Sequence, residues 1–222
     1  MQDQTWTAAE LVALDLEGTG SQDRQNEAIL EIAVVPLAGG RPDMGAAWHS
    51  IINPGRWIRP RPWISPGLSG AALTNAPSLD ALRGSIAEKL HGRILVGHNI
   101  GVDWRLIHMR LPDIEPAGLV DTARLVRHLQ PDIKRWNLTA LLAQHELEDE
   151  VKALVPDGQP HRALWDAVGA ALLLAELVGQ LPYKADTSLA TLTRVARLPR
   201  QPERENDDQL TLDLQPDTRA GA

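Results

Sequence analysis

The stretch "LVALDLEGTG" at residues 11–20 places two carboxylates inside an apolar run and closes it with glycines. Residues i and i+2 of a strand point to the same side, so Asp15 and Glu17 project together from a mostly buried face. Neighbouring carboxylates on such a face repel one another and lose hydration, and a bound cation would relieve both problems. The alternative is a strand that ends at Leu16 and leaves Glu17 in solvent above a glycine turn, because a short D-x-E pattern is weak by itself.

Composition limits the possible functions. The chain has 222 residues, a formal net charge of −7 and no cysteine. The acidic balance argues against nucleic-acid binding through a large basic surface, and the lack of cysteine excludes disulfides and thiolate metal sites. No apolar signal core follows a charged segment at the N-terminus, so we expect a cytoplasmic protein. The longest apolar run, at residues 163–178, contains Asp166 and Glu176 and is too short and too charged to suggest a membrane role.

The order of the predicted elements indicates an α/β domain with a mixed sheet flanked by helices. Ser78 and Asn137 are the expected N-caps of two of the helices, and a proline-rich loop covers residues 54–66. The predicted strands are 11–16, 29–37, 46–53 and 93–99, and the predicted helices are 79–90, from 101 onward, within 119–129, within 135–147 and from about 162 to 179.

A change in composition near Pro199 divides the chain. Residues 1–198 are expected to form one domain, and residues 199–222 contain six acids and three arginines among polar residues. Such a segment buries too little apolar surface to fold alone, so we predict a disordered acidic tail.

Two further acids fall in positions that suggest a shared site. In "VGHNIGVDWRL" a strand ends and a helix begins, which places Asp103 in the first helical turn, a position where a carboxylate interacts well with the helix dipole. In "PHRALWDAVGAALLLAEL" the helical neighbours of Asp166 are apolar, so this acid faces inward and needs a partner. His161 can join the same site only if it lies at or before the helix start, and the preceding Pro160 fits that placement.

Together these stretches resemble the DEDDh, or DnaQ-like, family of 3′-to-5′ exonucleases, which includes the proofreading epsilon subunit of bacterial DNA polymerase III. The matching motifs are "DLEGTG" at 15–20, "HNIGVD" at 98–103 and "HRALWD" at 161–166. The resemblance spans about residues 10–180 and implies a ribonuclease H-like fold. The chain departs from the family in having Gly18 in place of the usual Thr and Val102 in place of the usual Phe.

The four acids suit two hard divalent cations, Mg²⁺ or Mn²⁺, which prefer oxygen ligands. Such a pair activates water for attack on a phosphodiester, and His161 would accept the proton of that water. By this resemblance the catalytic residues are His161, Asp15, Glu17, Asp103 and Asp166, the last four also being metal ligands, and the substrate-binding residues are Gly18, Thr19, His98 and Asn99.

The expected reaction releases nucleoside 5′-monophosphates from single-stranded DNA ends, in proofreading or repair. No residue identified in the sequence reads a 2′-hydroxyl, so an exoribonuclease of the same superfamily stays open. A non-catalytic binding protein on a nuclease fold is a further alternative.

Two other segments suggest contacts with partners. Arginines and tryptophans alternate in "GRWIRPRPWISP" and either hold a single strand or fasten the loop to the core; they are Arg56, Trp57, Arg59, Arg61 and Trp63. In the tail, the cluster of Gln209, Leu210, Leu212 and Leu214 resembles the peptide by which bacterial replication and repair proteins bind the sliding clamp.

Overall fold

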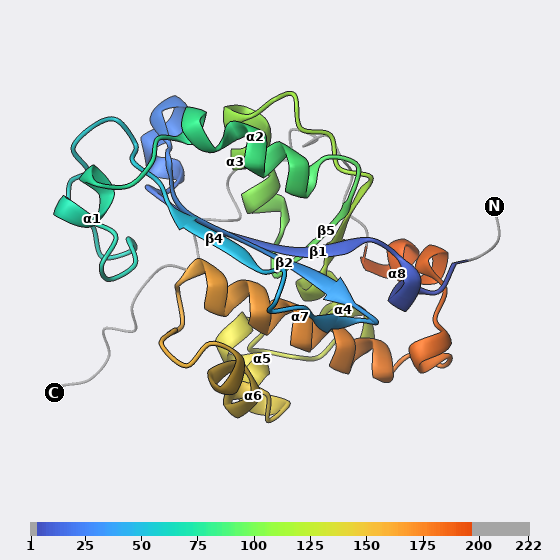
Figure 1. Cartoon of the computed structure of the whole chain (residues 1–222). Coiled ribbons are helices and arrows are strands. Elements are labelled where there is room, and N and C mark those ends of the chain that lie inside the picture. Colours follow the sequence, from blue (N-terminus) through green and yellow to red (C-terminus); the bar gives the residue numbers. More distant parts are fainter. Residues whose placement is uncertain (1–3, 197–222) are drawn as a thin grey trace, which may run out of the picture.

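A mixed β-sheet forms the centre of the computed structural model, in which residues 4–196 are described (Figure 1). The strand order is β3-β2-β1-β5-β6, with β4 also pairing with β2. β1 pairs antiparallel with β2, whereas β1, β5 and β6 run parallel, so the predicted mixed sheet is confirmed. The strands are β1 (Leu11–Gly18), β2 (Ile29–Ala38), β3 (Arg41–Pro42), β4 (Trp48–Ile51), β5 (Ile94–Gly97) and β6 (Gly118–Asp121).

Helices cover both faces of this sheet. In Figure 1, α2 and α3 lie above the sheet, and α4, α5, α6 and α7 lie below it. No helix of residues 4–196 is long and apolar enough to cross a membrane. The helices are α1 (Gly70–Thr74), α2 (Leu79–Leu90), α3 (Gly101–Arg110), α4 (Thr122–Leu129), α5 (Leu138–Gln144), α6 (Glu148–Leu154), α7 (Ala163–Gly179) and α8 (Leu189–Ala196), with short 3₁₀ helices η1 (Trp6–Ala8), η2 (Ser21–Asn26) and η3 (Lys184–Asp186).

The alternation of β1 divides the apolar residues between two cores. Leu11 and Ala13 pack in the cluster built around α7, and Val12 and Leu14 pack in the cluster formed with α2 and α3. All four are nearly inaccessible to solvent, and burial of each large side chain contributes about 1.5–3 kcal/mol. The acids that follow on β1 continue this alternation, so the core determines which way they point.

The parallel strands β1, β5 and β6 end at one edge of the sheet, where ligands of α/β proteins usually bind. Asp121 joins two of these strand ends. Its Oδ1 accepts hydrogen bonds from the backbone amides of Asn99 and Ala123, each at 2.9 Å, so one carboxylate holds the end of β5 and caps α4. The two caps expected from the sequence are confirmed, since Ser78 and Asn137 accept from the amides three residues later.

Several elements differ from those expected. The helix predicted within 135–147 is α5 alone, because Glu146 has a left-handed φ of 56° that separates α5 from α6. The sequence analysis also missed α1, β3, α6 and α8, all of which have eight residues or fewer. The predicted tail at 199–222 and its clamp-binding cluster lie outside the described residues, so the division of the chain at 198 stays a prediction.

Asp121→Ala should lower the free energy of unfolding by about 2 kcal/mol, because it removes a helix cap and leaves two backbone amides without an acceptor. Asp121→Asn, which keeps an acceptor oxygen, should lose less. Urea denaturation measures both, with the exposed Asp157→Ala variant expected within about 0.5 kcal/mol of the parent. Equal stability of Asp121→Ala and Asp157→Ala would contradict this account of the strand end.

Candidate active site

Three carboxylates meet at this edge of the sheet. Single oxygens of Asp15, Glu17 and Asp166 lie within 4.8 Å of one another. Asp15 and Glu17 point from β1 toward α7, and Asp166 stands in the first turn of α7. β1 continues to Gly18 with Glu17 paired to Glu31 of β2, so the alternative of a strand ending at Leu16 is wrong.

Asp103 lies beside these three carboxylates and is not part of the group that meets within 4.8 Å. It occupies the first turn of α3, as expected, and its Oδ1 accepts a hydrogen bond of 2.9 Å from the backbone amide of Leu16. Its charge still reaches the group, because after burial it is the main cause of the raised pKa of Asp15. The fourth acid therefore approaches the site from the opposite face of the sheet.

Burial and mutual repulsion make the group easy to protonate. Burial and the charges of Asp103 and Asp166 raise the pKa of Asp15 well above its usual range. The pKa of Glu17 rises to about 7, chiefly through burial, although the hydrogen bond from Ser65 opposes the rise. Burial also raises the pKa of Asp166, to about 6, against the lowering effect of His161.

The arrangement fits a divalent cation. Asp15 Oδ2 is buried and has no hydrogen-bond partner among the described residues. A buried carboxylate oxygen without a donor is costly, and a metal ion would satisfy it. Three converging carboxylates supply the hard oxygen ligands that Mg²⁺ and Mn²⁺ prefer.

His161 is exposed and stands just before α7, as its spacing from Asp166 required. Its φ of 64° lies in the left-handed region, which strains a residue other than glycine. The backbone amide of His161 hydrogen-bonds to the Asp166 carboxylate. The turn thus brings the imidazole and the last acid together at the start of one helix.

An ion pair that the sequence analysis missed holds this turn. Arg162 donates to Glu31 through Nε at 2.8 Å and Nη2 at 2.7 Å, and the Ala163 amide donates to the same carboxylate at 3.2 Å. Glu31 is buried in β2 next to Glu17. The signal in the sequence was an acid inside the apolar run "ILEIAVV", which requires a partner just as Asp15 does.

Ser65 is a second residue that the sequence did not reveal. Its hydroxyl is buried and donates a 2.6 Å hydrogen bond to Glu17 Oε2. It lies in the proline-rich loop, which has no periodic pattern. Only the folded path of that loop brings Ser65 to the acids.

A pocket of about 230 Å³ opens beside the carboxylates, with Glu17, Gly18, Trp63, Val102 and Asp103 among its lining residues. A Cβ at Gly18 would lie 3.2 Å from the Ala28 carbonyl oxygen and equally close to Leu106 Cδ2. The usual threonine of the family would crowd this position, so the departure at Gly18 follows from local packing. Val102 is 43% exposed and leaves its side of the pocket without an aromatic ring.

The proposed substrate residues differ in how they face the site. The Thr19 hydroxyl is buried and accepts from the Ala28 amide at 3.0 Å. Both ring nitrogens of His98 are engaged, Nδ1 with the Thr122 hydroxyl at 2.9 Å and Nε2 with the Trp136 carbonyl at 2.7 Å. Burial lowers the pKa of His98 to about 4, so the ring is neutral and its contacts are internal to the protein.

The two tryptophans of the proline-rich loop have different roles. Trp63 donates from its indole nitrogen to the Thr19 carbonyl at 3.0 Å and packs against Gly20, whereas Trp57 is 74% exposed. Arg61 lies over the Trp63 ring at 5.4 Å, and Arg56 pairs with Asp23 at 2.8 Å. Trp63 therefore fastens the loop and also lines the pocket. Trp57 is exposed and does not fasten the loop.

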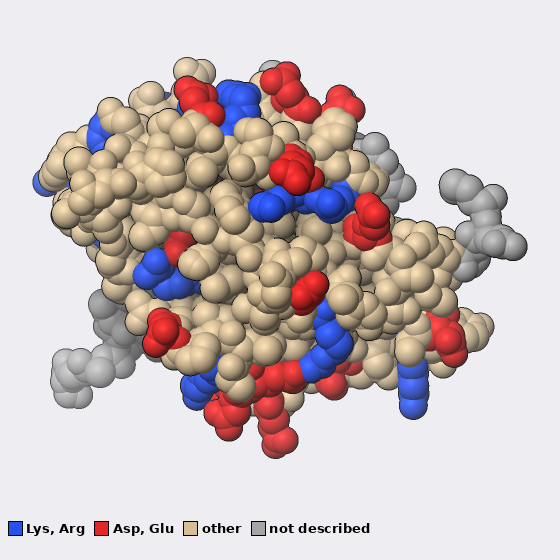
Figure 2. Space-filling view, viewed as in Figure 1, with Lys and Arg blue, Asp and Glu red and all other residues tan. Residues whose placement is uncertain are grey.

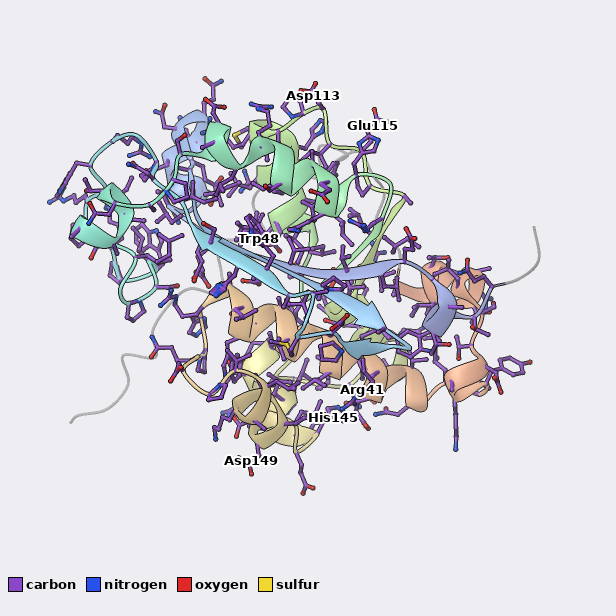
Figure 3. All side chains as sticks on the ribbon, in the orientation of Figure 1. Arg41, Trp48, Asp113, Glu115, His145 and Asp149 are labelled. Carbon is purple, nitrogen blue, oxygen red and sulfur yellow. The ribbon has the colours of Figure 1, made fainter. Side chains whose placement is uncertain are left out.

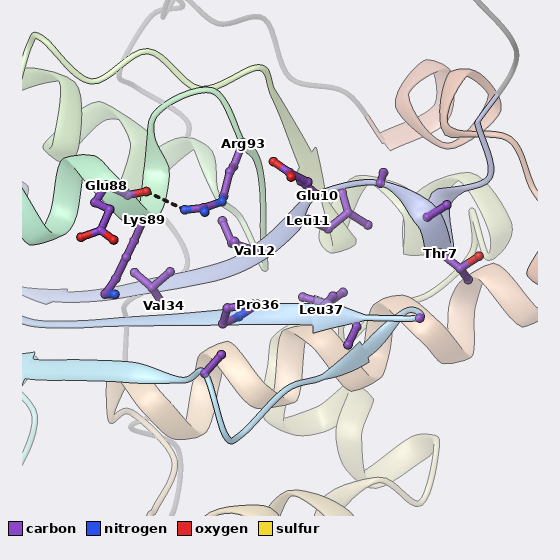
Figure 4. A pocket seen from close by; sticks show the side chains of 15 residues that line it. Thr7, Glu10, Leu11, Val12, Val34, Pro36, Leu37, Glu88, Lys89 and Arg93 are labelled. Carbon is purple, nitrogen blue, oxygen red and sulfur yellow. Dashed lines mark hydrogen bonds between the residues drawn. The ribbon is translucent and has the colours of Figure 1, made fainter.

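A second, larger pocket lies elsewhere. It has a volume of about 500 Å³ at the opposite edge of the sheet, where β1 begins and β2 ends (Figure 4). Glu10, Glu88, Lys89 and Arg93 are its charged lining residues. It contains none of the three converging carboxylates, and we assign the chemistry to the smaller pocket.

The fold and the acid cluster define a nuclease of the ribonuclease H-like class. The family model RNase_T, described as exonuclease, matches residues 12–174, and the chain belongs to this exonuclease family. The predicted resemblance is thereby confirmed.

Relatives support the same assignment. The DNA polymerase III subunit epsilon of Rickettsia conorii is 28% identical over 83% of this chain and 81% of its own length. The 3′-5′ exonuclease DinG of Bacillus subtilis is 28% identical over 82% of this chain, which spans only 19% of that protein. A solved structure of exonuclease X with 5′-overhanging duplex DNA superposes with a TM-score of 0.61 at 24% identity, covering 82% of this chain and 99% of that one.

The raised pKa values predict that metal-free protein loses stability as the pH rises. Glu17 ionises near its usual 4.5 when unfolded and at about 7 when folded, so the folded state binds more protons between these values. Unfolding free energy, measured with EDTA, should therefore fall as the pH rises from about 5 to about 7.5. Mg²⁺ should stabilise the protein more at the upper end, where the ligands are ionised. Glu17→Gln should flatten the dependence, and an unchanged slope would contradict the assigned burial.

Proposed function

We propose that this chain is a metal-dependent 3′-to-5′ exonuclease that releases nucleoside 5′-monophosphates from single-stranded DNA ends. The observation that carries the proposal is the convergence of Asp15, Glu17 and Asp166 around a buried carboxylate oxygen without a donor. The adjoining pocket gives a terminal nucleotide a place beside these acids. The name of the epsilon relative, a subunit of a DNA polymerase, favours DNA as the substrate.

In this proposal Asp15, Glu17, Asp103 and Asp166 hold two divalent ions, Mg²⁺ or Mn²⁺. Ions bound there supply charge neutralisation and Lewis-acid polarisation at the scissile phosphate. His161 accepts the proton of the attacking water as a general base, because its exposed imidazole stands beside the last acid at the start of α7. The ion pair between Glu31 and Arg162 keeps the turn that carries His161 against β2.

The pocket suggests how the terminal nucleotide is held. Trp63 offers an aromatic wall that replaces the ring absent at Val102, and Gly18 lets the nucleotide approach the backbone closely. Thr19, His98 and Asn99 contribute by shaping this edge, since the Thr19 hydroxyl and the His98 ring are bonded within the protein. Asn99 adopts a left-handed φ of 63° that turns the chain from β5 into α3.

The proposal includes a role in proofreading or repair, supported by the relative that is named as a DNA polymerase III subunit, and with it a partner that is bound to DNA. Docking of Gln209, Leu210, Leu212 and Leu214 on a sliding clamp would keep the enzyme near replicating DNA. The second candidate is an exoribonuclease, favoured by the likeness in fold to a 3′-exonuclease that recognises a histone mRNA stem-loop, with a TM-score of 0.56 at 11% identity. Parallel assays on DNA and RNA distinguish the two.

The test is hydrolysis of 5′-labelled single-stranded DNA and RNA with Mg²⁺ and with EDTA. The parent should shorten DNA from its 3′ end only with metal, and Asp15→Asn, Glu17→Gln, Asp103→Asn and Asp166→Asn should each abolish the reaction while keeping the fold by circular dichroism. The exposed Asp157→Asn is the matched control and should retain activity. Full activity of Asp166→Asn would overturn the shared metal site, and faster cleavage of RNA would favour the second candidate.

His161→Ala should lower kcat by about 10²–10⁴-fold, the usual contribution of a general base. Mn²⁺ affinity, measured by calorimetry, should stay close to that of the parent, because His161 is not among the proposed ligands. His49→Ala changes an exposed histidine on β4 and should leave both quantities unchanged. A loss below about tenfold across neutral pH would assign the proton transfer to another group.

A further inference from the structure

A basic segment stands out in this acidic protein. Residues 124–136, which run from α4 to the turn before α5, contain one acid, Asp132. Its four cationic side chains are all exposed; they are Arg124, Arg127, Lys134 and Arg135. The face shown in Figure 2 lacks any comparable group, since lysines and arginines are scattered there among acids.

The basic segment is tied to the edge of the sheet that carries the carboxylates. His98 lies directly after β5, and its Nε2 donates a 2.7 Å hydrogen bond to the Trp136 carbonyl, because a carbonyl oxygen only accepts. The neighbouring Asn99 is held by Asp121 at the end of β6. Ala13 of β1 is level with Val96 of β5 and Val120 of β6, and adjacent strands lie about 4.8 Å apart, so the end of β6 is about 10 Å from the part of β1 just before Asp15.

The charge of this segment is available to a ligand. Within residues 4–196, Arg56, Arg105 and Arg162 form ion pairs with acids, whereas the four cations of the basic segment form none. Arg127 instead lies 4.0 Å above the ring centroid of the half-buried Trp136. Its charge also lowers the pKa of His98, which agrees with its position near the end of β5.

We propose that the basic segment binds the backbone phosphates of the nucleotides that precede the 3′-terminal one, as a track for single-stranded nucleic acid leading to the acids. Cations that neutralise phosphates give sequence-independent affinity, and an arginine stacked on a tryptophan extends the flat surface that an unpaired base can meet. The inference rests on the proposed function and adds the path of the strand outside the pocket. The four carboxylates repel phosphate without metal, so a nearby basic surface also offsets that repulsion.

The test compares a long single-stranded oligonucleotide with a nitrophenyl ester of thymidine 5′-monophosphate, which fills only the terminal position. Lys134→Ala/Arg135→Ala should raise KM for the long substrate about tenfold and leave kcat/KM for the ester unchanged. Loss of two phosphate contacts should reduce the slope of log affinity against log salt by about 1.4, measured by fluorescence anisotropy with Ca²⁺ in place of Mg²⁺.

The matched control is Lys89→Ala/Arg93→Ala, which removes the same charge at the opposite edge of the sheet. Lys89 lies 5.8 Å over the ring of Trp48, which Figure 3 labels on the α2 side of the sheet. Both cations line the pocket of Figure 4. This control should bind the oligonucleotide with affinity close to that of the parent. The proposed track would be overturned if both double variants weakened oligonucleotide binding equally. It would also be overturned if Lys134→Ala/Arg135→Ala lowered kcat/KM equally for the ester and the long substrate. If the parent hydrolyses neither substrate, the proposed function fails, and the anisotropy comparison still decides whether the basic segment binds the strand.

Discussion

Repulsion among partly buried carboxylates is the constraint on which the rest of this structure depends. Asp15 and Glu17 cannot move apart, because their positions are set by the alternation that buries Leu11 and Ala13 against α7. Asp166 joins them from the helix that packs on the same face. The core therefore forces negative charges together, and burial first and repulsion by neighbouring acids second raise the pKa values of these carboxyl groups.

Neighbouring groups partly relieve this repulsion. Ser65 donates to Glu17, the Leu16 amide donates to Asp103, and Arg162 neutralises Glu31. None of the described residues donates to Asp15 Oδ2. This carboxylate oxygen therefore still lacks a positively charged partner, and it lies where the proposed reaction takes place. Membership of the exonuclease family accounts for an acidic site of this kind.

The sequence predicted the mixed sheet and the convergence of acids because both follow from local periodicity and motif spacing. Asp103 was expected among the other ligands, yet the structure places it to one side, held by the Leu16 amide. That offset, the Glu31 to Arg162 ion pair and the approach of Ser65 depend on strand register and loop path. Contacts between residues 48 or 131 positions apart leave no pattern in a single sequence.

The ion pair of Glu31 with Arg162 has a mechanical consequence. Arg162 lies between His161 and the helix that carries Asp166, and its two hydrogen bonds fix that junction to β2. A sliding movement of α7 along the sheet would break both bonds at once and carry the imidazole away from β1. The imidazole and the last acid are therefore coupled, because a displacement of this junction from β2 would move both of them together.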